Sequence, residues 1–306
     1  MKNTFLPFIF YCLLALFGCS KNKLDTITDG SIPNPGTDIV QLPVVIHMIH
    51  DGEDVGEGAN LSKERVLRQI EILNEDFRRK VGTNGFNDHP DGADTKIEFV
   101  LAQFTPDFKR FNGINRIDTS KKPVDNLGYN QNHYAQFAFW PPDEYINIWV
   151  TPLPLSSTCL ALGVSSGPDI ELPGSELFSV PQDDDAEGIL INWIHFGESN
   201  IDCHAKLGRT LTHEMGHYLG LLHTWGGRDC AHNDYCDDTP AVNEPIFGSK
   251  AILGCDGEAV MIGNYMNYSD DAVMNIFTKD QAERMYYVLR HHAGRKGLMT
   301  STAIER

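Results

Sequence analysis

The apolar residues of this chain fall into short continuous runs and into stripes with helical spacing, which indicates a mixture of strands and helices. Apolar runs bounded by turn residues are typical of buried strands. We expect strands at residues 42–49, 97–104, 145–150, 159–164 and 188–194. No internal repeat accompanies them, and the pattern favours an α+β fold with a mixed, twisted sheet.

Three segments carry the spacing of a helix. We expect helices at residues 62–77, 206–219 and 279–291. Ser62 can cap the first helix, and its apolar residues lie on one stripe. Thr278 and Gln281 form a capping box at the start of the last helix. The middle helix differs from the other two because several of its residues suit metal chemistry.

That middle helix contains a His-Glu-x-x-His motif that continues beyond its end. His213 and His217 lie four residues apart, so both imidazoles project from one helix face. Gly220 can adopt a positive φ and end the helix, which brings His223 back towards the other two. Three protein ligands leave one tetrahedral position of zinc open, as in catalytic sites. Glu214 stands next to the first ligand, where its carboxylate can take a proton from water.

The alternative interpretation is a helix whose polar residues merely face solvent. The complete eleven-residue pattern would arise by chance in about one in ten thousand such chains, which disfavours that alternative. Together with a methionine turn downstream, the pattern resembles the metzincin signature. In metzincins this methionine lies beneath the zinc, and Met266 within residues 264–268 fits that role. The resemblance implies that Tyr268 supplies a hydroxyl near the metal, where it can stabilise an oxyanion.

Composition and charge limit the classes of function that this protein can have. The chain has 306 residues, of which 41% are hydrophobic and 22% charged, as in ordinary globular proteins. Its net charge of −17 argues against nucleic-acid binding, which requires a basic surface. The acidity does not identify a substrate, and the sequence indicates no oligomeric state.

The first residues have the features of an export signal. Lys2 is followed by an apolar run over residues 5–17, which is too short to span a bilayer comfortably. We expect residues 1–18 to be a signal peptide and Cys19 to carry lipid, as at a bacterial lipobox, with a plain secretory signal as the alternative. Residues 19–38 then form a lipidated tether or a short pro-segment. The expected location is the outer membrane or cell surface, or the medium, and the lipid would be the contact with a membrane.

Seven cysteines are present, and five of them follow the presumed lipid site. They are Cys159, Cys203, Cys230, Cys236 and Cys255. An exported protein can form disulfides, and an odd number leaves at least one thiol unpaired. The connectivity stays open. A bridge between Cys236 and Cys255, which would close a loop of about twenty residues, is one option.

The chain resembles the pappalysin family of metzincins more closely than other metzincins. The motifs that carry this resemblance lie at residues 208–225, 237–240 and 264–278. It implies a zincin fold with a backing helix and an active-site helix above the cleft. It also implies an N-terminal catalytic subdomain at residues 39–223, then a smaller, loop-rich C-terminal subdomain at residues 224–306 with the Met-turn and a terminal helix. In metzincins a strand at the cleft rim pairs with the substrate; residues 159–164 are our candidate, with a simple loop as the alternative.

The same resemblance extends to ligands and chemistry. It implies His213, His217 and His223 as zinc ligands, Glu214 as base and acid, and Tyr268 as a catalytic helper. Family members can bind calcium after the third histidine, and the matching candidates here are Asp234, Asp237 and Thr239. Val273 stands where the family often has a cysteine, so the disulfide pattern is altered. Asp270 and Asp271 leave a basic preference on the primed side as a hypothesis.

These observations lead to one main hypothesis about function. We expect a zinc-dependent metalloendopeptidase, exported and lipid-anchored, which acts on proteins or peptides and takes Zn²⁺, with Ca²⁺ as a candidate second ion. Two alternatives stay open. One is a non-catalytic surface lipoprotein with structural zinc, and the other is a metallohydrolase that acts on a non-peptide amide.

Overall fold

The computed structural model describes residues 38–121, 128–153, 159, 162–178, 186–231 and 233–305. The predicted signal peptide, Cys19 and nearly all of the tether lie outside the described residues. Within the described part, no helix is both long enough and apolar enough to cross a lipid bilayer.

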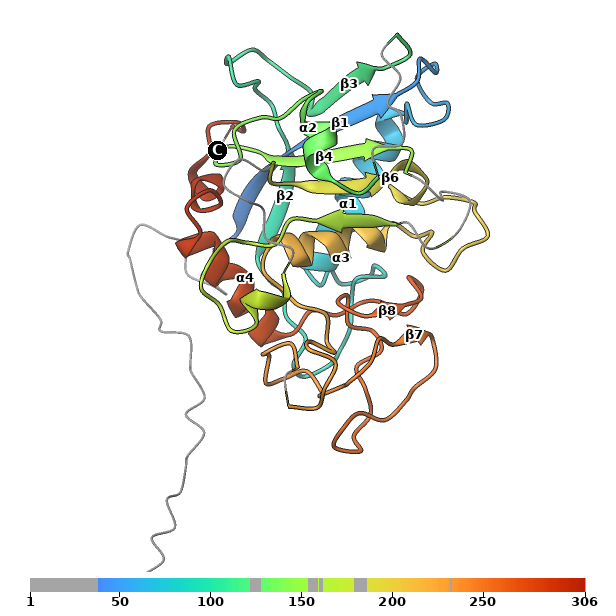
Figure 1. The fold of residues 1–306 in the computed structure, drawn as a ribbon, viewed down its shortest axis with the longest axis vertical. Coiled ribbons are helices and arrows are strands. Elements are labelled where there is room, and N and C mark those ends of the chain that lie inside the picture. Colours follow the sequence, from blue (N-terminus) through green and yellow to red (C-terminus); the bar gives the residue numbers. More distant parts are fainter. Residues whose placement is uncertain are drawn as a thin grey trace, which may run out of the picture.

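A six-stranded sheet occupies the upper part of the molecule in Figure 1. Its strands are β1 (Val40–His50), β2 (Ile97–Leu101), β3 (Ile114–Asp118), β4 (Ile146–Thr151), β5 (Gly163–Ser165) and β6 (Ile189–Asn192). Their order is β2-β1-β4-β6-β5, and β3 pairs with the second half of β1 beyond the end of β2. Every pair is parallel except β5 with β6, so the sheet is mixed and its antiparallel strand lies at one edge.

Strand β1 is buried along nearly its whole length because both faces of the sheet are covered. Leu42, Val44 and Ile46 pack into the main core with the helices. Val45 and Ile49, which point to the opposite face, belong to two smaller clusters. The alternation of strand side chains therefore explains why a continuous apolar run is needed here.

Two helices cover one face of the sheet, α1 (Lys63–Phe77) and α3 (Arg209–Tyr218). The hydroxyl of Ser62 caps α1 by accepting from the Arg65 amide. The two helices are joined by a buried polar contact, in which Asp76 accepts from the Thr212 hydroxyl at 2.7 Å and pairs with Arg209 at 3.3 Å. This contact fixes α3, the helix that carries the predicted ligands, against the backing helix.

After α3 the chain is mostly irregular and lies below this helix in Figure 1, and it then returns to the sheet. The remaining elements are α2 (Gln131–Ala135), β7 (Phe247–Gly248), β8 (Tyr268–Ser269), α4 (Lys279–His291) and the short 3₁₀ segments Ser175–Leu177, Trp193–His195 and Lys296–Thr300. The Gln103 amide donates to the carbonyl of Ala303 at 2.7 Å. The C-terminal end thus packs beside β2, although the sequence analysis placed it in the loop-rich subdomain of residues 224–306. The division at residue 223 stays a prediction.

The helices and strands predicted from the sequence are present in the structure, but several begin or end at other residues. The capping box of Thr278 and Gln281 is present at α4. Helix α3 begins at Arg209 rather than at residue 206, because Gly208 has a φ of 83° and cannot lie inside a helix. The strand expected at residues 159–164 is instead Gly163–Ser165. Cys159 lies before it and is bonded to Cys203.

Candidate active site

Three imidazoles converge at the end of α3. The Nε2 atoms of His213 and His217 are 3.1 Å apart, and that of His223 lies 3.2 Å and 3.1 Å from them. The Nδ1 atom of His213 lies 2.7 Å from the Tyr265 carbonyl, and that of His217 lies 2.8 Å from the Leu221 carbonyl. A carbonyl accepts only from N–H, so Nδ1 carries the proton in both rings and Nε2 is left with a lone pair.

This arrangement fits a cation. Two lone pairs 3.1 Å apart repel each other unless a positive ion lies between them. Neutral imidazoles with their outer nitrogens bound to carbonyls are the usual ligands of zinc. The three residues predicted from the motif are therefore brought together with the donor atoms that zinc requires.

The turn after α3 depends on Gly220. Its φ is 93°, and a Cβ at this position would lie 2.5 Å from Val288 of α4. The amides of Gly220 and Leu221 bind the carbonyls of His217 and Gly216, which closes the helix end. A residue with a side chain would be strained and would also clash, so glycine is needed to return the chain towards His223.

Glu214 is buried beside the edge strand. Loss of solvation raises its pKa to about 8, and the main-chain N–H of Ser165 in β5 partly opposes this rise. A Cβ on Gly163 would lie 3.1 Å from the Glu214 side chain, so the strand packs directly on it. A cation held by the three imidazoles would lower the pKa again and favour the carboxylate.

Met266 is completely buried and packs against α3 at Gly216. A Cβ on Gly216 would lie 2.5 Å from the Met266 sulfur, so the thioether fills the space that this glycine leaves on α3. The Met266 amide donates to the Asn264 side chain at 2.9 Å, and that side chain pairs with Gln281 of α4. The methionine turn is thus held through Gln281, which is also part of the capping box of α4.

Tyr268 stands at the side of the site and remains 39% exposed. Its ring centroid lies 4.9 Å from that of His223 and 5.7 Å from that of His213. Burial raises the pKa of its phenol, so the hydroxyl keeps its proton and can donate a hydrogen bond.

A cavity of about 650 Å³ opens in front of these residues. Its walls include Glu214, the three histidines and Tyr268. Residues 162–165 form its upper rim, and β5 is the last strand in the sheet order within the described residues. An extended peptide can add to such an edge through main-chain hydrogen bonds.

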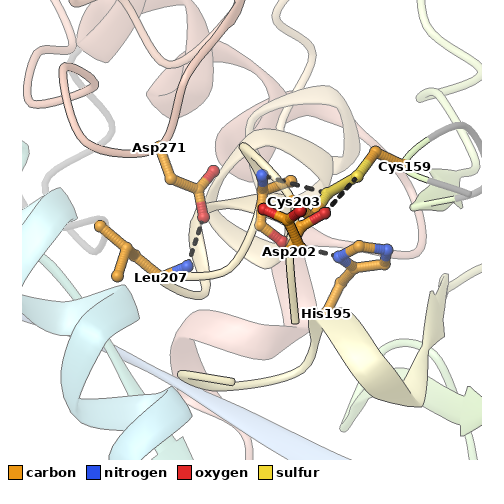
Figure 2. Close-up of a disulfide and its surroundings, with 7 residues drawn as sticks. Cys159, His195, Asp202, Cys203, Leu207 and Asp271 are labelled. Atoms are coloured by element: carbon orange, nitrogen blue, oxygen red, sulfur yellow. Dashed lines mark hydrogen bonds between the residues drawn. A yellow bond between two sulfur atoms is a disulfide. The ribbon is translucent and has the colours of Figure 1, made fainter. Parts of the chain in front are cut away.

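One wall of this cavity includes Asp271, which the sequence analysis connected only with a hypothesis of basic preference. The carboxylate of Asp271 accepts from the amides of Leu207 at 2.7 Å and Arg209 at 3.3 Å, just before α3. The Asp271 amide in turn donates to the His204 carbonyl. Figure 2 shows Asp271 bonded to Leu207 beside the disulfide between Cys159 and Cys203. Both His204 and Asp271 line the cavity, and no motif in the sequence singled out His204.

The candidate calcium residues are only partly assembled. Asp234 is buried, and its Oδ1 accepts from the Cys236 amide at 3.2 Å and the Thr239 hydroxyl at 2.6 Å. Its Oδ2 has no partner among the described residues, and burial raises the pKa of Asp234 to about 7. Asp237 has an exposed side chain, while its amide donates to Asp280 at the start of α4.

The disulfides of the structure differ from one pairing that the sequence analysis considered. Cys230 pairs with Cys255, and Cys159 pairs with Cys203. The bridge between Cys236 and Cys255 is therefore wrong. Cys236 is the cysteine with a free thiol, in agreement with the odd number of cysteines expected from the sequence. Its side chain is buried and contributes to packing.

Comparisons with known proteins agree with this geometry. The model of peptidase family M43, described as pregnancy-associated plasma protein-A, matches residues 129–290. Extracellular metalloprotease 1 of Coccidioides posadasii is 46% identical over 81 residues, which cover 26% of this chain and 29% of the relative. An extracellular metalloprotease of Colletotrichum graminicola is 44% identical over 87 residues, 26% of this chain and 31% of the relative. The chain thus spans less than a third of the curated relatives it matches.

Solved structures match over a much larger share. Mature mirolysin of Tannerella forsythia, in complex with a cleaved peptide, has a TM-score of 0.68 and 29% identity, and the match covers 86% of this chain and 96% of that one. Mirolysin in complex with compound 9 has a TM-score of 0.69 and 28% identity, with coverage of 87% and 97%.

Proposed function

The chain belongs to the pappalysin family of metzincin metallopeptidases, and we propose that it is a zinc-dependent endopeptidase that hydrolyses internal peptide bonds of proteins or peptides. The observation that carries this proposal is the convergence of three Nε2 atoms within 3.2 Å of one another beside a buried glutamate. The cavity in front of them is bounded by an edge strand that suits an extended peptide.

The proposed metal ligands are His213, His217 and His223. When bound there, zinc would polarise a substrate carbonyl and make water more acidic. Glu214 would accept the proton of the attacking water and deliver it to the nitrogen of the leaving amine. Its buried position beside β5 keeps the carboxylate close to the rim where a peptide would lie.

Tyr268, the edge of β5 and Met266 would assist. Tyr268, as a protonated phenol, would donate a hydrogen bond to the oxygen that gains negative charge during attack. The edge of β5 would align the substrate main chain by adding a strand to the sheet. Met266 would support the ligands from below without taking part in proton transfer.

The decisive experiment compares wild type with E214Q on casein and on a peptide library, with one equivalent of zinc. Removal of a general acid–base lowers the rate by about 10²- to 10⁴-fold, so E214Q should lose activity to that extent. Its zinc content and melting temperature should equal those of wild type, which is the control for folding. Y268F should retain part of the activity, since only one hydrogen bond is lost.

Wild-type protein that holds one zinc ion and still cuts no peptide would refute the proposed function. Cleavage of non-peptide amides alone would favour a different metallohydrolase. Equal activity of wild type and E214Q would refute the role of Glu214 but not the peptidase itself.

We also propose a calcium site at Asp234 and Thr239, with Asp237 as a further oxygen donor. The support is the buried Asp234 carboxylate, one of whose oxygens has no partner among the described residues. A cation would compensate for that buried charge. Millimolar Ca²⁺ should raise the melting temperature of zinc-loaded wild type but not of D234N. Equal shifts in both proteins, or none in wild type, would count against the site.

For cellular location we propose export and attachment through a lipid on Cys19. The support is the sequence pattern of residues 1–20 and the extracellular naming of the two fungal relatives. Labelling of bacterial cultures with a clickable fatty acid should mark wild type and not C19A. An unlabelled wild type found in the medium would instead indicate a plain secretory signal.

A further inference from the structure

The three histidines are not held in the same way. His213 and His217 each direct Nδ1 to a main-chain carbonyl, which fixes the rotation of the ring. For His223, no hydrogen bond of Nδ1 is formed within the described part of the chain. A ligand ring without such a bond can rotate about its last side-chain torsion, which is a broad one, unless packing prevents it.

Trp225 supplies that packing. Its ring lies on the ring of His223 with the centroids 4.2 Å apart and the planes within 9° of parallel. Tyr268 meets both rings edge-on, at 4.9 Å from His223 and 4.8 Å from Trp225. The indole therefore covers one face of the imidazole while the tyrosine blocks another direction.

Trp225 itself is firmly held. It is only 3% exposed and forms a small core in the loop-rich region with Val242, Ile246 and Val260. No residue of the sheet or of the long helices belongs to this cluster. The orientation of the third histidine thus depends on the packing of this cluster, whereas the rings of His213 and His217 are fixed by the carbonyls of Tyr265 and Leu221.

We propose that Trp225 is the positioning residue of the third ligand, and that its stacked indole takes the place of the Nδ1 hydrogen bond that His223 does not form with any described residue. This inference rests on the metal-binding part of the proposed function. Partners that orient a metal ligand typically change metal affinity by about 10- to 100-fold. The expected effect of losing the stacked ring is a weaker zinc site in a protein that is still folded.

The test compares W225F, which keeps a flat ring, with W225L, which keeps apolar packing but removes the ring. Zinc affinity is measured on metal-free, folded protein by competition with a coloured chelator. W225L should bind zinc about 10- to 100-fold more weakly, whereas W225F should stay close to wild type. The visible spectrum of the Co²⁺ form should change in W225L only.

A second measurement uses the indole as a reporter. Co²⁺ should quench part of the tryptophan emission of wild type, because Trp225 lies on a ligand ring. That quenching should disappear in W225F and persist in W193F, which removes a tryptophan of the Trp193–His195 segment as a matched control.

The outcomes separate the possibilities. Unchanged zinc affinity in W225L, with only a lower melting temperature of the metal-free protein, would reduce Trp225 to a packing residue and overturn the proposal. Equal weakening in W225F and W225L would also overturn it, since stacking would then not be the cause. A wild type that binds no zinc would remove both this inference and the proposed function. A wild type that binds zinc but cuts no peptide would remove the function alone.

Discussion

Acid should destabilise this protein through His47, a buried histidine in the centre of β1. The ring is fully buried and lies between Asn147 of β4 and Asn115 of β3. Asn147 accepts from Nε2–H at 2.9 Å, and its orientation is fixed because it also binds the main chain of Trp140 at both its oxygen and its nitrogen. The rings of Trp140 and Trp149 also contact the imidazole, and among the described residues no hydrogen bond or ion pair joins it to a charged side chain.

Burial lowers the pKa of His47 from 6.5 to about 4 in the folded protein, and the hydrogen bond to Asn147 opposes this only in part. The unfolded chain therefore binds this proton more readily than the folded one between those two values. The unfolding free energy carries no penalty from His47 above pH 6.5, and it decreases as the pH falls from 6.5 towards 4. At 1.36 kcal/mol per pH unit, the loss amounts to about 3 kcal/mol. A turned amide of Asn115 could accept from the charged ring, but it supplies no negative charge.

The assay is denaturant unfolding of wild type and H47Q between pH 7 and pH 4. The other histidines and any release of metal affect both proteins alike, so they cancel in the difference. H47Q should be less stable than wild type at pH 7, and the gap should shrink by about 3 kcal/mol on acidification. Parallel pH profiles would show that His47 does not titrate as its burial requires, and the reasoning would be wrong.

Three further changes test the packing that supports the site. G216A places a Cβ 2.5 Å from the sulfur of Met266 and should cost about 1–3 kcal/mol of unfolding free energy; an unchanged urea midpoint would mean that Met266 moves aside freely. R295M removes a fully buried guanidinium that binds main-chain and carboxylate oxygens, and should lower the unfolding free energy by about 3–5 kcal/mol in the same assay. A loss below about 1 kcal/mol would mean that these hydrogen bonds of Arg295 contribute little to stability. The double variant of Cys230 and Cys255 to serine opens a separation of 25 residues and should cost about 3.5 kcal/mol; a wild-type thermal midpoint would contradict that estimate.

Much of the candidate site could be predicted because its key relations are local. His213 and His217 share a helix face through a fixed spacing, and Gly220 ends that helix by a backbone conformation that glycine favours. The capping box at α4 is likewise a relation among residues three apart. Such features depend on a few neighbouring residues, so their geometry can be read before the fold is known.

Contacts between distant segments could not be read in this way. Asp271 binds the Leu207 amide across 64 residues, and no periodicity relates the two positions. The choice of Cys230 over Cys236 as the partner of Cys255 depends on which sulfur the folded loop turns outward. The stacking of Trp225 on His223 is close in sequence, yet it depends on the direction in which the chain leaves the Gly220 turn.

The end of α3 shows why the last residues of the described chain belong to the catalytic architecture. Its final carbonyls have no partner within the helix and carry partial negative charge. Arg284 of α4 donates to the Gly220 carbonyl at 2.6 Å, and Arg295 donates to the Tyr218 carbonyl. Arg295 also binds the carbonyl of Gly167, two residues beyond β5, at 3.0 Å. Arg295 thus links the end of the helix that carries the predicted ligands to the segment that follows the strand at the cleft rim. This link adds to the direct packing of that strand on α3.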